Sequence, residues 1–346
     1  MRFEHKVIDA SPAGTENDVC LIVDVNGDGY NDIVIGGKVG EDNLVWYEYP
    51  DWTRRTIATA RLEAGGVVLD ITGNGRPDIV AGGDYNSNEL YWFENPGPPY
   101  ENWPKRLIED EFLKYHDQAI GDVDGDGEDE IVVLSQQAGM VVYYDIPADP
   151  RVSPWPKECR HVICEGLQVE GAAVCDLDGD GRMEVVAGPY WFKFDGKVWQ
   201  RHPIAPDYRL TCVAVGDLDG DGRPEVVLSE GESDPGRLAW FSGFPDWQVH
   251  LLREDLFHPH SLAVADMDGD GRLDIMVGEM GLKDHPGPRM IVYRNRGGGE
   301  FEEVLVDDQH PTHHAKVGVI GDGPLPSIVG KPYSPKNAVD LWLNMG

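Results

Sequence analysis

The chain contains 346 residues, of which 41% are hydrophobic, so it is long enough for one large all-β domain or two ordinary domains. Its formal net charge of −33 argues against nucleic acid and against an anionic membrane surface as partners, and no apolar run approaches the roughly 18–20 residues of a membrane span. Five Cys without a CxxC pair do not make a disulfide framework, and the first residues lack a secretory apolar core. The expected compartment is therefore the cytoplasm, unless a signal peptide has been removed.

A nine-residue acidic loop recurs along the chain. Its clearest copy places Asp266, Asp268, Asp270 and Asp274 at positions 1, 3, 5 and 9, with Gly271 at position 6. Oxygen ligands at this spacing around a tight glycine turn suit a hard cation such as Ca²⁺. Related loops start at Asp24, Asp70, Asp122, Asp176 and Asp217, and a degraded copy starts at Gly318. Seven units of about fifty residues account for the whole chain, which indicates a repeat architecture.

Each repeat predicts four β-strands. A small apolar strand precedes the loop, and a β-prone run such as Asp32–Ile35 follows it. A fourth strand opens with an aromatic residue and ends with an aliphatic one five residues later, as from Trp247 to Leu252. The third strand carries an aromatic residue in a fixed column: Trp46, Trp92, Tyr143, Trp191, Trp240, Tyr293 and Trp342. Sugar stacking and packing of blade against blade both explain such a column, and we expect packing.

The seventh repeat stops after its third strand, and the missing fourth strand fits the other end of the chain, from Phe3 to Ile8. We therefore predict an all-β fold, a seven-bladed β-propeller of four-stranded blades. Residues 1–346 would form a single domain, and residues of about 313–346 plus 2–9 would form the last blade. Closure by the N-terminal strand would leave no sheet edge exposed.

The repeated loop and strand pattern resembles the FG-GAP/VCBS family, the calcium-loop propeller repeat also found in integrin α-subunit heads. Six of the seven loops carry the motif, and the resemblance covers essentially the full length. Propellers with similar repeats include polysaccharide lyases of the rhamnogalacturonan and ulvan types and an aldos-2-ulose dehydratase. The resemblance thus implies a calcium-binding propeller and favours a carbohydrate substrate or ligand.

Five loops are expected to hold structural Ca²⁺ ions, because each offers three or four carboxylates. The loop at Asp70 has neutral Thr72 and Asn74 at positions 3 and 5, so it should bind weakly or not at all. The predicted ligands are Asp24, Asn26, Asp28 and Asp32; Asp122, Asp124, Asp126 and Glu130; Asp176, Asp178, Asp180 and Glu184; Asp217, Asp219, Asp221 and Glu225; and Asp266, Asp268, Asp270 and Asp274.

A second candidate site lies at the other end of the inner strands. Counting six residues back from the loop starts leads to His116, Glu170 and His260. Further polar residues, among them His285, His313 and His314, fall in connections on the same face. A hydrated channel mouth tolerates such residues without any function, but their variation from blade to blade within a repeating scaffold suggests a specific ligand.

Two functions remain open at this mouth. One is a carbohydrate lyase or dehydratase that acts by β-elimination on a uronate-containing or keto sugar. Its candidate residues are His116 and His260 as acid, base or metal ligands, Tyr190 or Tyr333 as proton carrier, and Arg209 or Lys331 for a carboxylate or carbonyl. His116, Glu170, His260 and His314 could also bind one transition metal. The alternative is a non-catalytic propeller that binds glycan or protein.

Overall fold

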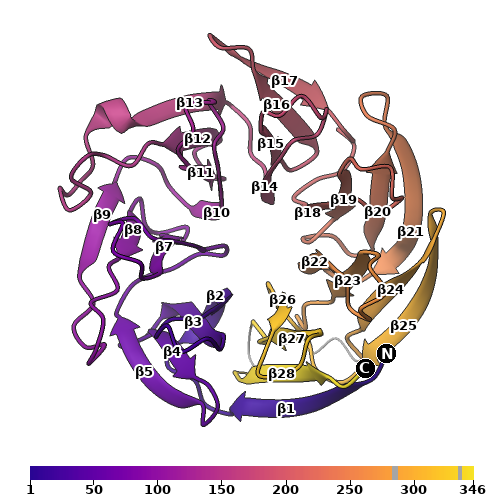
Figure 1. The fold of residues 1–346 in the computed structure, drawn as a ribbon, viewed down its shortest axis with the longest axis horizontal. Helices are drawn as coiled ribbons and strands as arrows, with labels where there is room; N and C mark the ends of the chain where they lie inside the picture. The colour runs from indigo at the N-terminus through magenta and orange to yellow at the C-terminus, as the bar shows by residue number, and fades with distance from the viewer. Residues whose placement is uncertain (283–286, 334–336) are drawn as a thin grey trace.

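The structure is a computed structural model that describes residues 1–282, 287–333 and 337–346. Its seven four-stranded antiparallel sheets stand around a common centre as the blades of a propeller (Figure 1). The described residues contain one short 3₁₀ helix, η1 (Lys157–Cys159), and none of their helices is long and apolar enough to cross a membrane. The predicted seven-bladed β-propeller is thus confirmed.

Each blade contains four strands, which follow one another from the centre of the ring to its rim. The innermost strands are β2 (Thr15–Val23), β6 (Val67–Leu69), β10 (Tyr115–Gly121), β14 (Ala172–Cys175), β18 (Cys212–Gly216), β22 (Ser261–Ala265) and β26 (Lys316–Val319). The second strands are β3 (Asp32–Val39), β7 (Asp78–Gly82), β11 (Glu130–Ser135), β15 (Glu184–Ala187), β19 (Glu225–Ser229), β23 (Asp274–Gly278) and β27 (Pro326–Gly330). The third strands are β4 (Leu44–Glu48), β8 (Leu90–Phe93), β12 (Met140–Tyr144), β16 (Tyr190–Phe194), β20 (Gly236–Ser242), β24 (Met290–Gly297) and β28 (Val339–Asn344). The outermost strands are β5 (Thr53–Ala58), β9 (Lys105–Glu109), β13 (Arg160–Glu165), β17 (Trp199–Pro203), β21 (Gln248–Leu256) and β25 (Glu300–Asp307).

The N-terminal strand β1 (Phe3–Asp9) completes the seventh blade. It pairs antiparallel with β28, with His5 opposite Trp342 and Lys6 opposite Leu341. The indigo N-terminal strand therefore lies along the yellow C-terminal strand at the rim of the ring (Figure 1). Both ends of the chain are needed to make this sheet four-stranded, as the sequence predicted.

The hydrophobic core is divided among the junctions between blades. Each of seven apolar clusters combines buried side chains from two neighbouring blades. The third strands supply much of it, because adjacent residues of a strand point to opposite faces. Trp46 packs towards the second blade, whereas its neighbour Tyr47 packs towards the seventh. The aromatic column therefore packs blade against blade.

The position of this aromatic column in the last two blades differs from the prediction. Trp46 pairs with Val34, the second apolar residue of β3, but Tyr293 and Trp342 pair with the first apolar residue of their second strands, Ile275 and Ile328. The first five blades carry two adjacent aromatic residues, and the last two keep only the second of them. A single fixed column was therefore wrong for Tyr293 and Trp342.

Candidate functional site

The acidic loops connect the first and second strands of each blade, and their backbone holds two carboxylates in place. In the sixth blade, the carboxylate of Asp266 at position 1 accepts hydrogen bonds from the backbone N–H groups of Gly269 and Gly271. The position 9 carboxylate, Asp274, is buried and accepts a hydrogen bond of 2.9 Å from the N–H of Met267. The same bond to position 9 recurs in all six loops, so the repeated sequence produces a repeated cradle.

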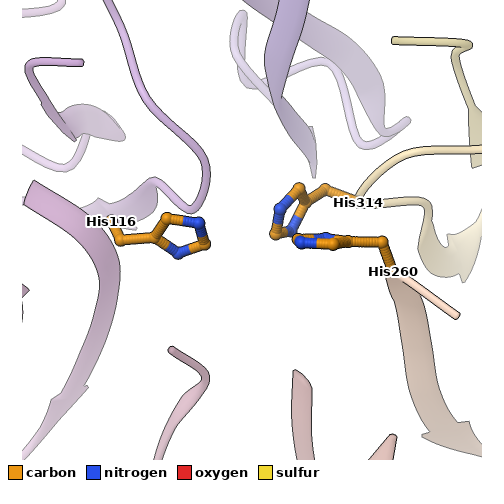
Figure 2. A group of neighbouring side chains, drawn as sticks. All are labelled: His116, His260 and His314. Carbon is orange, nitrogen blue, oxygen red and sulfur yellow. The ribbon is translucent and has the colours of Figure 1, made fainter. Parts of the chain in front are cut away.

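Three histidines meet at the opposite ends of the inner strands. His116 lies in β10, His260 directly precedes β22 and His314 lies just before β26. The ring of His116 faces those of His260 and His314 (Figure 2), and one ligand nitrogen of each lies within 4.8 Å of the others. All three side chains are almost fully buried, with residue exposures of 3%, 1% and 9%.

Two carboxylates join this cluster. Glu170 lies between two histidines, with Oε1 3.3 Å from Nε2 of His116 and Oε2 3.8 Å from Nε2 of His260. Glu232, in the connection between β19 and β20, places Oε1 3.1 Å from Nε2 of His260. The hydrogen bond from His260 lowers the pKa of Glu232 to about 2, so this carboxylate stays ionised. Together these five residues form the histidine–glutamate cluster: His116, Glu170, Glu232, His260 and His314.

His116 is oriented by a carboxylate behind it. Its Nδ1 lies 2.6 Å from Oδ2 of Asp117, which also accepts a hydrogen bond of 2.7 Å from the backbone N–H of Gly171. Gly171 has a φ of +80°, and a Cβ built there would lie 2.4 Å from the carbonyl oxygen of Thr211, so a larger residue would displace this support. With Nδ1 held in this way, Nε2 of His116 faces the cluster.

The charges within the cluster are divided unequally. Burial disfavours the cation of His116, but Glu170 and Asp117 outweigh it and raise the pKa of this residue. Burial and the neighbouring His260 instead lower the pKa of His314 well below its ordinary value. Neutral His314 therefore offers a lone pair, and among the described residues its buried Nε2 has no hydrogen-bond partner.

A cavity of about 80 Å³ opens onto this cluster. It is lined by His116, Glu170, His260 and His314, together with small residues such as Gly171 and Ala172. About 10–15 Å³ of such space holds one water, so the cavity has room for an ion together with water molecules.

A second buried network adjoins the cluster. Lys38 Nζ lies 2.6 Å from Asp18 Oδ2 and 2.8 Å from Glu63 Oε1, while Asp18 Oδ1 lies 2.9 Å from Nδ1 of His313. Tyr333 stands beside it, with its ring centroid 4.8 Å from that of His313 and its hydroxyl 3.4 Å from Lys38 Nζ. Lys331 donates a hydrogen bond of 2.6 Å to the carbonyl oxygen of His313.

The structure separates the residues that the sequence grouped at the mouth. It brings together His116, Glu170, His260 and His314, with Tyr333 and Lys331 in the adjoining network. Tyr190 lies elsewhere, in β16, with the guanidinium of Arg201 5.3 Å from its ring centroid. Arg209 is exposed in the connection before β18 and does not line the cavity. His285 lies outside the described residues.

The sequence analysis did not identify Glu232, which lies in the same connection as Glu230. Glu230 instead binds Arg237, with Oε2 2.7 Å from Nε. Three acidic residues crowd this turn, Glu230, Glu232 and Asp234, and a turn has no strand alternation to show which of them faces the channel. The three neighbouring acidic residues were the only signal in the sequence that pointed to Glu232.

A family model described as FG-GAP-like repeat matches residues 70–133, 122–187 and 217–277, which together make up more than half of the chain. The chain belongs to the FG-GAP-like repeat family. The matched segments contain the acidic loops that start at Asp70, Asp122, Asp176, Asp217 and Asp266.

Solved structures with the same fold include members with different roles. The FG-GAP-like chain is 10% identical to the Vibrio cholerae biofilm matrix protein Bap1, with a TM-score of 0.57 over 99% of this chain and 91% of that one. It is 13% identical to the rhamnogalacturonan lyase YesW, with a TM-score of 0.54 over 99% of this chain and 76% of that one. No match was found among curated protein sequences. At these identities the likeness shows a shared fold.

Proposed function

We propose that the histidine–glutamate cluster holds one divalent transition metal and that the protein uses it as a carbohydrate lyase or dehydratase. The observation that carries this proposal is the convergence of His116, His260 and His314 on one buried space (Figure 2). Three imidazoles with one or two carboxylates suit Zn²⁺, Mn²⁺ or Fe²⁺, whereas oxygen-only sets suit Ca²⁺ and Mg²⁺.

The donor set fits such an ion in three ways. The unpaired Nε2 of His314 leaves a buried polar atom that a metal would satisfy. The bond from His116 Nδ1 to Asp117 is the outer carboxylate contact that metal-binding histidines usually make. The small cavity has room for the ion with a water or a substrate oxygen. His116, His260, His314 and Glu170 would be ligands, and Glu232 would be a ligand or a base.

The reaction that fits best is β-elimination from a uronate-containing or keto sugar. A bound metal supplies Lewis acidity towards a carbonyl or carboxylate oxygen, which acidifies the neighbouring C–H. Glu232 is the cluster residue that a substrate can reach, because its side chain is 39% exposed, and it would accept this proton. The C–H electron pair then forms the C=C bond while the C–O bond to the leaving oxygen breaks.

Tyr333 can supply the proton that the leaving oxygen needs. Burial raises the pKa of Tyr333 to about 12, so its hydroxyl stays protonated at neutral pH. It stands at the edge of the cluster beside His313. The similarity in fold to a rhamnogalacturonan lyase supports a polysaccharide substrate, and the similarity to a biofilm matrix protein supports a carbohydrate setting more broadly.

We further propose that the acidic loops bind Ca²⁺ as structural ions. In the third blade, oxygens of Asp122, Asp124, Asp126 and Glu130 all lie within 4.8 Å of one another. Such crowding of carboxylates is costly unless a cation neutralises it.

The test combines metal content with activity. The purified protein, H314A and the control H202A would be loaded with Zn²⁺ or Mn²⁺ in excess Ca²⁺, and bound metal would be counted by mass spectrometry. His202 stacks on Trp191 in an outer strand, far from the cluster. We expect one transition metal in the wild type and in H202A, and none in H314A.

The same three proteins and E232Q would then be incubated with a panel of uronate-containing polysaccharides, and new ultraviolet absorbance from unsaturated products would be followed. Wild type and H202A should show turnover that H314A and E232Q lack. Metal binding without turnover, together with glycan binding that survives both substitutions, would replace the lyase by the binding propeller. Equal metal content in H314A would refute the metal centre itself.

A further inference from the structure

One position beside each acidic loop differs in charge from blade to blade. This position lies on the third strand. The residue just before it pairs with the first apolar residue of the second strand, as Phe192 pairs with Val185 in the fourth blade and Tyr293 with Ile275 in the sixth. In blades 1 to 7 this position holds Glu48, Glu94, Asp145, Lys193, Ser242, Arg294 and Leu343. The first three blades thus have an acid here, and the fourth and sixth have a base.

In the fourth blade the basic side chain enters the acidic loop. Lys193 Nζ contacts Asp178, lies 2.7 Å from Asp180 Oδ2 and lies 3.1 Å from Glu184 Oε1. These three carboxylates occupy positions 3, 5 and 9 of the loop. The ammonium therefore stands where a cation bound by the loop would have to stand.

The sixth blade repeats this arrangement with arginine. Arg294 Nε contacts Asp268, and its Nη2 lies 4.0 Å from Asp270 Oδ2. Arg272, within the same loop, contacts the same oxygen of Asp270. Positions 3 and 5 of this loop are thus neutralised by two guanidinium groups of the same blade.

The third and fifth blades lack such a base. In the third blade the position holds Asp145, whose Oδ2 lies 3.0 Å from Nε2 of His161, so no lysine or arginine reaches the loop from this position. In the fifth blade, Ser242 is uncharged and its hydroxyl lies 2.8 Å from Nε2 of His250. Among the described residues, no Lys or Arg forms an ion pair with Asp217, Asp219, Asp221 or Glu225.

We infer that Lys193 and Arg294 are built-in counter-ions, so that the loops are of two kinds. The loops of blades 4 and 6 are neutralised from within the chain, and tight divalent-cation sites are confined to blades 1, 3 and 5. An ion that enters the fourth loop must displace the ammonium of Lys193. Because this ammonium belongs to the adjacent strand of the same chain, its contact with the loop carries no entropic cost of association. This inference rests on the proposal that the acidic loops bind divalent cations.

Calcium titration of the full chain tests this division. The protein would be stripped with EGTA, and Ca²⁺ binding would be measured by calorimetry for wild type, K193M, K193S and S242K. We expect K193M and K193S to gain one tight site, with affinity at the fourth loop higher by about tenfold or more. S242K should lose the fifth-blade site. The control is K197M, which removes an exposed lysine from the same blade.

Melting in EGTA gives an independent measurement. Without calcium, K193M should melt below both wild type and K197M, because its loop loses the built-in counter-ion, and added Ca²⁺ should remove this difference. Identical site numbers and affinities in wild type, K193M and K193S would overturn the inference. Absence of calcium binding in every protein, wild type included, would instead show that the loops bind no ion and would remove the basis of both proposals.

Discussion

The side-chain amide of Asn295 donates a hydrogen bond of 2.7 Å to the backbone carbonyl oxygen of Leu218, and so joins blade 6 to blade 5. Asn95 and Asn344 occupy the same position in blades 2 and 7 and bond to Val25 and Met267 in the preceding blades. Each accepting carbonyl belongs to the second residue of an acidic loop. The backbone N–H of that same residue donates a hydrogen bond to the position 9 carboxylate. The loops therefore hold neighbouring blades together even apart from any ion.

Replacing this asparagine should weaken the ring. N295A removes a buried hydrogen bond between blades and leaves the carbonyl of Leu218 unpaired, so we expect a loss of about 1–3 kcal/mol in the free energy of unfolding. Urea denaturation followed by tryptophan fluorescence measures this loss. N86A, at an exposed asparagine, serves as the control and should unfold at the wild-type urea concentration. Equal midpoints for the two variants would show that the bond contributes nothing.

Removal of divalent ions should lower the melting temperature. A site saturated at 100 times its dissociation constant contributes about 2.7 kcal/mol, and more than one loop is expected to be filled. Differential scanning calorimetry with EGTA and then with excess Ca²⁺ provides the measurement.

A variant of the third loop assigns this effect to a ligand. D126N removes a position 5 carboxylate, whereas D129N changes an exposed neighbour in the same loop. Only D126N should reduce the calcium-dependent rise in melting temperature. An unchanged melting temperature in EGTA would contradict a structural role for the ions.

Lys331 should make stability depend on pH in the alkaline range. Its side chain is fully buried, and burial lowers its pKa to about 8 against roughly 10.4 for an unfolded chain. Between these values the unfolded chain binds more protons than the folded one, so stability rises with pH across this window. Below pH 8 the folded protein carries the full cost of burying the ammonium, on the order of 3 kcal/mol.

The comparison with K331M isolates this contribution. K331M should melt above wild type at pH 7, and the difference should shrink as the pH approaches 10. K6M, at an exposed lysine of β1, should run parallel to wild type throughout. A pH-independent difference between K331M and wild type would mean that Lys331 does not change its proton affinity on folding.

Loss of β1 should open the seventh blade. Deletion of residues 1–9 exposes the unpaired backbone edge of β28, and we expect the melting temperature to fall by at least about 5 °C. A deletion of residues 1–2 alone, which precede the strand, is the matched control. Gel filtration should show self-association of the longer deletion, because the free edge can pair with another chain. A monomer with wild-type stability would argue against closure by β1.

The propeller could be predicted from the sequence because its physical causes are periodic. The acidic loops recur at a nearly constant interval, and Phe3 to Ile8 carries the spacing that the seventh repeat lacks. Counting six residues back from the loop starts led to His116 and His260, which occupy equivalent places at the ends of inner strands. Tyr293 and Trp342 departed from the column because one of two adjacent aromatic residues is absent from their blades.

The rest of the site could not be predicted, because it depends on turns. Glu232 enters the cluster from a connection without a repeat, and Arg209 leaves the mouth for the same reason. Tyr190 was expected at the channel mouth, but it is the first residue of β16 and not part of the connection before it. Side-chain direction in a turn follows from local backbone angles, which neither composition nor spacing specifies.

Closure by β1 has a consequence for synthesis on the ribosome. Strand β1 ends at Asp9 and its partner β28 begins at Val339, so β1 is synthesised long before β28. At typical translation rates this interval lasts on the order of tens of seconds, during which six blades can form while β1 has no neighbour. Throughout this interval the nascent chain carries the unpaired edge of β1, and a chain truncated before Val339 would keep that edge exposed to other nascent chains.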